Sequence, residues 1–159
     1  MFRLPPGVGC RWKGSYIELY GPQGVIPLKI RTRFVQNSKH ICFSRPLTWG
    51  EKNRLLKSMR GVCLSYGTSL ILQGIGYRAE VVGTDLQLRL GYSHSIDITI
   101  PEGVSVKCVK NMILLNSCHW DALNIFTTKL RKLRYPNPYK GTGILYGGEV
   151  IILKEGKKA

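Results

Sequence analysis

Apolar residues recur at helical intervals in two segments of the chain. The first begins at Thr48 and Glu51, which have the spacing of a capping box, where two residues satisfy each other's backbone groups at a helix N-terminus. The pattern breaks at Gly67. We therefore expect a helix with one buried face, formed by Leu55, Leu56, Met59, Val62, Cys63 and Tyr66.

The second helical segment comes after Ser117, which we expect to be its N-cap, and ends before Pro136. Its apolar stripe consists of Leu123, Phe126, Leu130 and Leu133. Its last turn is basic, which complements the negative end of the helix dipole, and carries Lys129, Arg131, Lys132 and Arg134.

Alternating apolar and polar residues predict strands between the two helices, over residues 69–82, 85–92 and 95–100. In the second strand Gln87 and Arg89 point to one side, and the other side is formed by Leu86, Leu88 and Leu90. This is the pattern of a half-buried antiparallel strand, which leaves one face free for a partner.

The two halves of the chain resemble each other at an offset of 96 residues, which places residues 4–21 on residues 100–117. Both stretches read as a P-x-G-V turn, an extended run and a polar break. Each leads towards one predicted helix. We therefore expect an α+β protein of two similar small domains, 1–73 and 74–159, each an antiparallel sheet with one packed helix, related by internal duplication.

The charge of the chain points to a polyanionic partner. Its 159 residues include 24 Lys and Arg against 9 Asp and Glu, a net charge of +15, and nucleic acid is the commonest partner of such a surface. An anionic membrane is the competing partner, but the basic residues are scattered along the chain instead of forming one amphipathic helix or polybasic tail. No apolar run approaches the roughly 18 to 20 residues that span a bilayer.

Cysteine spacing and catalytic motifs give no sign of a metal, a cofactor or a small-molecule substrate. The five cysteines form no C-x-x-C pair, and the two His/Cys neighbours, His40 with Cys42 and Cys118 with His119, have no second pair at zinc-finger spacing. No phosphate-binding loop, nucleophile elbow or H-E-x-x-H motif is present in the sequence, and no carboxylate pair stands out. We therefore expect that the protein is not an enzyme.

The densest candidate site is RKLRYPNPYKGTGILYGGEVIILKEGKK, residues 131–158. Tyr135, Tyr139 and Tyr146 offer faces for bases, and Gly141 and Gly143 let the backbone approach phosphates. The alternative is a solvated loop that only keeps the protein soluble. Positive charge comes from Arg131, Lys132, Arg134, Lys140, Lys154, Lys157 and Lys158.

Smaller candidates are Arg78, beside Tyr77, and the neighbours Tyr92 and His94. Each reads equally well as a contact to RNA or as packing with a surface charge.

Three motifs taken together resemble the L-six family of large-subunit ribosomal proteins: G-x-G-Y-R-A at residues 74–79, L-G-Y-S-H at 90–94 and P-Y-K-G-x-G-I at 138–144. The resemblance covers nearly the whole chain in order. Departures are Ser95, where the family usually has proline, Asn137, where an acidic residue is common, and residues 34–47, which fit poorly.

This resemblance implies two similar α+β domains, and binding of the C-terminal domain to large-subunit rRNA near the sarcin–ricin loop, on the side where translation factors dock. It implies neighbouring large-subunit proteins as further partners. The implied contacts are Tyr139, Lys140, Gly141 and Gly143, supported by Arg131, Lys132 and Arg134.

The short N-terminal segment, the bulky aliphatic residues and the divergent helix at residues 118–134 resemble proteins encoded in organellar genomes. A mitochondrial ribosome is the first expectation, with a plastid or the bacterial cytoplasm as alternatives. The alternative function is a basic adaptor that binds an acidic protein outside the ribosome.

Overall fold

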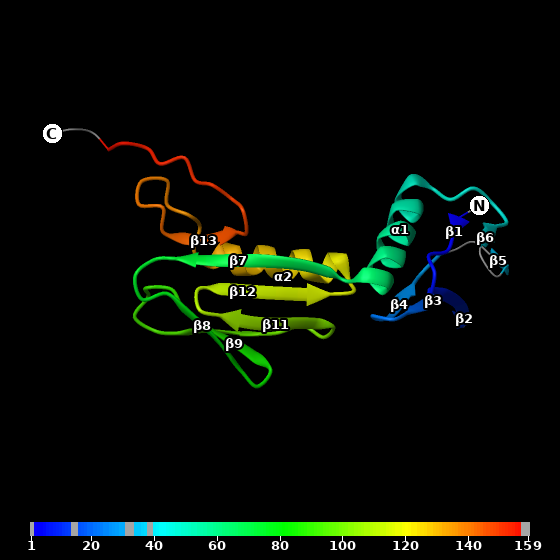
Figure 1. The fold of residues 1–159 in the computed structure, drawn as a ribbon, viewed down its shortest axis with the longest axis horizontal. Coiled ribbons are helices and arrows are strands. Elements are labelled where there is room, and N and C mark those ends of the chain that lie inside the picture. Colours follow the sequence, from blue (N-terminus) through cyan, green and yellow to red (C-terminus); the bar gives the residue numbers. More distant parts are fainter. Residues whose placement is uncertain (1, 14–15, 31–33, 38–39, 157–159) are drawn as a thin grey trace. The chain divides into compact units, whose positions relative to one another are not determined.

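A computed structural model describes residues 2–13, 16–30, 34–37 and 40–156 (Figure 1). The chain divides into two compact units. The first comprises Met1–Tyr66 with Cys118–Trp120, and the second comprises Gly67–Ser117 with Asp121–Ala159. Each unit combines one long helix with antiparallel strand pairs, which confirms the predicted α+β class.

The first unit contains two three-stranded antiparallel sheets and helix α1 (Trp49–Leu64). One sheet has the order β2-β3-β4, from Gly9–Lys13, Tyr16–Gly21 and Gly24–Leu28. The other has the order β1-β6-β5, from Phe2–Arg3, His40–Phe43 and Phe34–Asn37.

Helix α1 begins at the predicted capping box. The Thr48 hydroxyl accepts a hydrogen bond from the Glu51 backbone N–H at 3.4 Å, and the Glu51 carboxylate accepts one from the Thr48 N–H at 3.0 Å. The Ser65 N–H still donates to Gly61 as in a helix, but the helix ends at Leu64 because Ser65 adopts a φ of +57°. The prediction that Tyr66 lies on the helix is wrong, since this residue begins the next strand.

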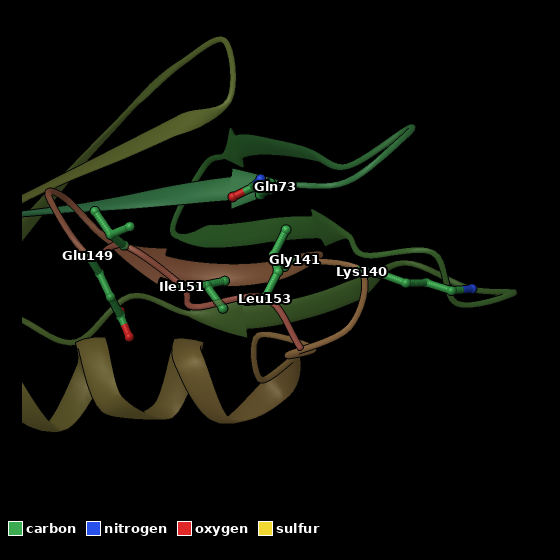
Figure 2. Close-up of a pocket in the computed structure, with 7 residues that line it drawn as sticks. Gln73, Lys140, Gly141, Glu149, Ile151 and Leu153 are labelled. Carbon is green, nitrogen blue, oxygen red and sulfur yellow. The ribbon is translucent and has the colours of Figure 1, made fainter. Parts of the chain in front are cut away.

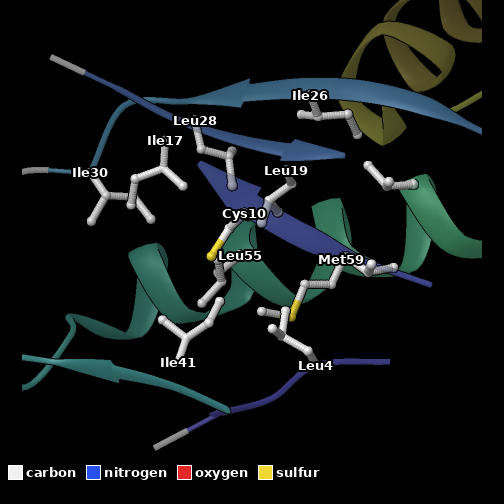
Figure 3. Packing of buried hydrophobic residues seen from close by; sticks show 12 residues of the cluster. Leu4, Cys10, Ile17, Leu19, Ile26, Leu28, Ile30, Ile41, Leu55 and Met59 are labelled. Carbon is white, nitrogen blue, oxygen red and sulfur yellow. The ribbon is translucent and has the colours of Figure 1, made fainter. Parts of the chain in front are cut away.

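The core of the first unit forms where the inward residues of β3 and β4 meet α1 (Figure 3). Ile17, Leu19 and Leu55 are completely or almost completely buried there. Cys10 joins this core, and burial raises the pKa of its thiol to about 11. Cys42, in contrast, is exposed, so the cysteines do not share one environment.

The second unit has a four-stranded sheet of order β11-β12-β7-β13 and a three-stranded sheet of order β10-β9-β8. Their bounds are β7 Tyr66–Gln73, β8 Arg78–Val82, β9 Asp85–Arg89, β10 Ile96–Thr99, β11 Val104–Val109, β12 Met112–Ser117 and β13 Gly143–Tyr146. Helix α2 (Trp120–Leu133) runs along the four-stranded sheet and buries Leu123, Phe126 and Leu130 (Figure 1).

The single strand predicted over residues 69–82 is in fact two strands, β7 and β8, joined by a tight turn. Gly76 has a φ of +74°, and the Tyr77 N–H donates to the Gly74 carbonyl at 3.4 Å. The alternation in the next strand is confirmed, because Leu86, Leu88 and Leu90 are fully buried. The strands predicted to reach residues 92 and 100 end earlier, at Arg89 and Thr99.

Ser117 is not the N-cap of α2, so that prediction is wrong. It is the last residue of β12, and its hydroxyl donates to the Gly103 carbonyl at 2.7 Å, which commits it to the neighbouring strand end. The helix itself begins at Trp120. The Ser117 hydroxyl donates to a carbonyl across the hairpin, and as the end of a strand Ser117 lies too far from the first turn of α2 to cap it.

The repeat found in the sequence is a repeat of structure. Gly7 and Gly103 have φ values of +80° and +78°, and in each turn the next residue, Val8 or Val104, donates its N–H to the proline carbonyl at 3.2 Å. Each turn leads into an antiparallel hairpin, β2–β3 or β11–β12. The two halves therefore share a common hairpin, as the predicted duplication requires.

The division between the units lies at Tyr66 and Gly67, whereas the sequence pattern predicts a domain boundary between residues 73 and 74. The difference arises because β7 lies between β12 and β13 in the sheet of the second unit. Residues 67–73 thus pack with the C-terminal part of the chain.

Candidate nucleic-acid interface

The loop between α2 and β13, residues 134–143, is closed by backbone hydrogen bonds. The Ile144 N–H donates to Arg134 at 3.0 Å, the Asn137 N–H to Thr142 at 2.9 Å and the Gly141 N–H to Asn137 at 2.8 Å. A surface loop with this many internal hydrogen bonds has one preferred shape. It therefore fixes the backbone positions from which its side chains project.

Asn137 organises the tip of this loop. Its side-chain Oδ1 accepts the backbone N–H groups of Tyr139 at 2.8 Å and of Lys140 at 3.3 Å, which forms an Asx turn. Tyr139 is 59% exposed and Lys140 is also exposed. The tip thus offers one aromatic face and one cation to solvent, side by side in the sequence, on a backbone that is already ordered.

Gly141 and Gly143 are buried and shape the loop. Their φ values are +70° and +151°, which favour glycine. A Cβ on Gly143 would lie 2.5 Å from the Cα of Pro136. The Gly141 N–H, which we expected to be available to a phosphate, instead donates to the Asn137 carbonyl within the loop.

Arg131 is held inside the second unit. Its Nη2 donates to Oε1 of Glu149 at 2.6 Å, and its guanidinium lies 4.8 Å from the centre of the Tyr146 ring. The other carboxylate oxygen of Glu149 accepts the Tyr146 N–H at 3.1 Å. This backbone hydrogen bond, together with Arg131, holds the pKa of Glu149 below its ordinary value.

Arg134 and Tyr92 form a second internal pair. The guanidinium of Arg134 lies 4.8 Å from the centre of the Tyr92 ring. The Tyr92 hydroxyl donates to the Leu133 carbonyl at 2.9 Å, at the C-terminus of α2. Tyr92 is still 43% exposed, so this pair both fixes the helix end and forms part of the surface.

The remaining predicted cations differ in their placement. Lys132 is exposed on the last turn of α2, and Lys154 is exposed on the C-terminal segment. The backbone N–H of Lys154 donates to the Pro138 carbonyl at 2.9 Å, which attaches this segment to the loop. Lys157 and Lys158 lie outside the described residues. The helix end, the loop and the C-terminal segment therefore form one basic region.

Arg78 and His94 are both exposed, on β8 and after β9. Arg78 stands opposite Arg89 in the β8–β9 pairing, at a shallow depression also lined by Glu80 and Gln87. Like charges in opposite positions repel each other, so this pair adds positive potential without adding stability.

Three further residues shape this region, and no sequence pattern singled them out. Glu149 holds Arg131, and Gln73 and Leu153 line a hollow beside Lys140 and Gly141 (Figure 2). Gln73 comes from β7, far from the loop in sequence, and only the β7–β13 pairing brings it close. A periodicity in the sequence cannot reveal such a contact.

Over the part of the chain that the structure describes, no group of three or more His, Cys, Asp or Glu side chains is placed to hold a metal ion. No helix in the same part is long and apolar enough to cross a membrane.

The sequence model of the family described as Ribosomal protein L6 matches residues 73–147, which include the loop and part of the lining of the hollow. The large ribosomal subunit protein uL6c of Trieres chinensis is 38% identical over 149 residues, covering 91% of this chain and 83% of that protein. The chain belongs to the ribosomal protein L6 family. The large ribosomal subunit proteins uL6 of Paracoccus denitrificans and Mycoplasma pneumoniae are 35% and 37% identical, covering 98% of this chain and 94% and 91% of those proteins.

Membership of the L6 family decides the general class of this protein. The family consists of structural ribosomal proteins, and the chain is therefore not an enzyme. Membership also explains the resemblance seen in the three sequence motifs, since all three lie within the matched residues.

Proposed function

We propose that this L6 protein is a structural constituent of the large ribosomal subunit and binds large-subunit rRNA through the loop at residues 134–143 and the basic residues beside it. The observation that carries the proposal is the Asx turn at Asn137, which orders the exposed Tyr139 and Lys140 before any partner arrives. A preordered tip loses little conformational entropy on binding.

Within this site the residues have different roles. Lys140, Lys132 and Lys154 are exposed and neutralise phosphates, while Tyr139 stacks on a base or a sugar. Arg131 holds the segment after β13 and Arg134 packs on Tyr92, and the outer edges of both guanidinium groups add positive potential. Shape and charge, with little base-specific readout, select a folded RNA surface.

We propose that this contact lies near the sarcin–ricin loop, on the side of the subunit where translation factors dock, as the family resemblance implies. In that position the protein supports subunit assembly and braces the factor-binding region during translation. Neighbouring large-subunit proteins complete its surroundings. Arg78, Tyr92 and His94 lie on the second unit and extend the same contact.

We further propose a mitochondrial ribosome as the site of action, on the basis of the many bulky aliphatic residues and the divergent second helix. Relatives are known from bacteria such as Paracoccus denitrificans and also as the uL6c protein of Trieres chinensis, so a plastid and the bacterial cytoplasm are the alternatives. Fractionation of cells that carry a tagged copy decides between the compartments.

The ribosomal role is tested by sedimentation of the tagged full-length protein through a sucrose gradient, with and without RNase. We expect co-migration with the large subunit that is lost after RNase treatment. A light, RNase-resistant complex would instead identify an adaptor bound to an acidic protein. The Lys140→Ala variant should incorporate less well than Lys52→Ala, an exposed lysine of α1 that serves as the matched control.

A further inference from the structure

A hollow of about 280 Å³ lies between the loop and the C-terminal segment in the second unit (Figure 2). Its walls come from Gln73 on β7, from Lys140 and Gly141 on the loop, and from Ile151 and Leu153 on the C-terminal segment. The hydrogen bond from Lys154 to Pro138 fixes that segment across the loop, so the two walls are tied together.

Gly141 keeps this hollow open. A Cβ at Gly141 would lie 3.3 Å from Cδ2 of Leu153 and 3.7 Å from Nε2 of Gln73. A side chain at this position would therefore narrow the space between the apolar wall and the carboxamide. The bare Cα, together with a φ of +70°, leaves that space free.

The charges around the hollow favour a ligand that carries a phosphate. Glu149 lines one side, but its carboxylate is already bound by Arg131 at 2.6 Å and by the Tyr146 N–H at 3.1 Å. Figure 2 shows Glu149 directed towards α2, and Lys140 projecting outward from the loop. The cation of Lys140 thus remains on the rim, beside apolar walls and one amide.

The amide can bind the edge of an adenine. Gln73 is exposed, and its carboxamide offers a donor and an acceptor in one plane, which can pair with the N6–H donor and the N1 or N7 acceptor of adenine. A volume at the lower end of the usual range of ligand sites suits a single ring system. RNA is read by proteins mainly through bases that have left the stack.

We propose that the hollow receives one unstacked adenine of the large-subunit rRNA, with Gln73 bound to its edge, Ile151 and Leu153 against its face, and Lys140 at its phosphate. This inference rests on the proposed rRNA-binding function and adds a site of base recognition to a contact otherwise made by shape and charge. A side chain of a neighbouring protein is the competing occupant, and in that case no adenine of the rRNA should depend on Gln73.

The test is chemical probing of an in vitro transcript of the cognate large-subunit rRNA, free and bound to the full-length protein. Dimethyl sulfate reports on adenine N1 and diethyl pyrocarbonate on adenine N7. The Gln73→Leu variant removes the amide but keeps a side chain of similar size. Gln23→Leu, an exposed glutamine of the first unit, is the matched control. Gly141→Ala narrows the hollow by a second route.

We expect one adenine that is protected by the wild-type protein and by Gln23→Leu, but reacts about tenfold more with Gln73→Leu, the scale of one bidentate contact. Protection of the surrounding backbone should persist. Gly141→Ala should expose the same adenine. A backbone footprint with no adenine that depends on Gln73 would overturn the adenine site alone, and this is the result expected if the hollow takes a side chain of a neighbouring protein instead. Absence of any footprint would overturn the proposed function as well.

Discussion

Nη2 of Arg131 lies 2.6 Å from Oε1 of Glu149, and this contact joins the last turn of α2 to the segment after β13. The basic end of this helix is therefore partly neutralised from within. Arg131 thus fixes the geometry of the region in addition to adding positive charge, which the charges along the sequence do not reveal.

This ion pair predicts a dependence of stability on pH. The pKa of Glu149 is lowered from its ordinary 4.5 in the folded protein, chiefly by the Tyr146 N–H and then by Arg131. The carboxylate therefore stabilises the fold above about pH 4.5, and this contribution is lost as the pH falls through the lowered value. The free energy of unfolding can be measured with denaturant at several pH values. Between pH 5 and the lowered pKa it should fall less for Glu149→Gln than for the wild type, by up to about 1 kcal/mol.

The control for this measurement is Glu102→Gln, an exposed glutamate in the turn before β11. It should follow the wild-type pH profile. Identical profiles for Glu149→Gln and the wild type would show that the contact contributes nothing to the folded state in solution.

Removal of the Lys140 side chain should change the salt dependence of rRNA binding. If it neutralises one phosphate, Lys140→Ala should reduce the slope of log affinity against log salt by roughly 0.7 to 0.9. Tyr139→Ala should leave the slope unchanged and weaken binding by about 1 to 3 kcal/mol, because stacking is not electrostatic in this sense. Filter binding across a salt series measures both. An unchanged slope for Lys140→Ala would remove this residue from the phosphate contacts.

The two hydrogen bonds to Asn137 order the tip of the loop, and we expect that their loss disorders the tip without unfolding the protein. Asn137→Ala removes the acceptor for the Tyr139 and Lys140 N–H groups, so rRNA affinity should fall by about tenfold, the effect of one lost charged or stacking contact, while the melting temperature changes little. Asn137→Asp keeps an acceptor oxygen for both N–H groups and should retain most of the affinity.

Hydrogen exchange at the two amides provides the structural measurement for this pair of variants. Exchange at Tyr139 and Lys140 should accelerate in Asn137→Ala and stay slow in Asn137→Asp. Fast exchange in the wild-type protein would contradict the Asx turn itself.

We expect the helix cap at Thr48 to contribute to the stability of the first unit. Thr48→Ala removes the acceptor for the Glu51 N–H at the start of α1 and should lower the free energy of unfolding by about 1 kcal/mol. Thr48→Ser should restore most of it, since the hydroxyl is retained. Equal stability of the alanine and serine variants would show that the capping box is not significant in solution.

Much of the fold can be predicted from local patterns in the sequence. The capping box at Thr48, the alternating leucines from Leu86 to Leu90 and the stripe on α2 each depend on neighbours a few residues away, and each is present. The errors arise where a distant partner competes with a local one. Ser117 bonds to Gly103 across a hairpin, and β7 joins the second unit because β13 lies beside it.

The candidate site shows the same division. Its composition and the exposed tip at Tyr139 and Lys140 could be predicted, because a run of cations, tyrosines, prolines and glycines is visible in one segment. The different contacts that those cations make could not be predicted. Whether an arginine faces solvent or an internal carboxylate depends on Glu149 and Tyr92, and nothing local to Arg131 or Arg134 specifies these partners.

The matching turns at Gly7 and Gly103 have an evolutionary consequence. If one ancestral hairpin was copied, both copies kept the geometry that folding requires, while the segments after each hairpin were free to diverge. Among the described residues, the ordered tip at Tyr139 and Lys140 comes after the second copy, so under the proposed function selection for the rRNA contact falls mainly on that half. The first copy was then constrained chiefly by packing, and substitutions in its hairpin should be tolerated wherever they preserve the buried residues and the glycine.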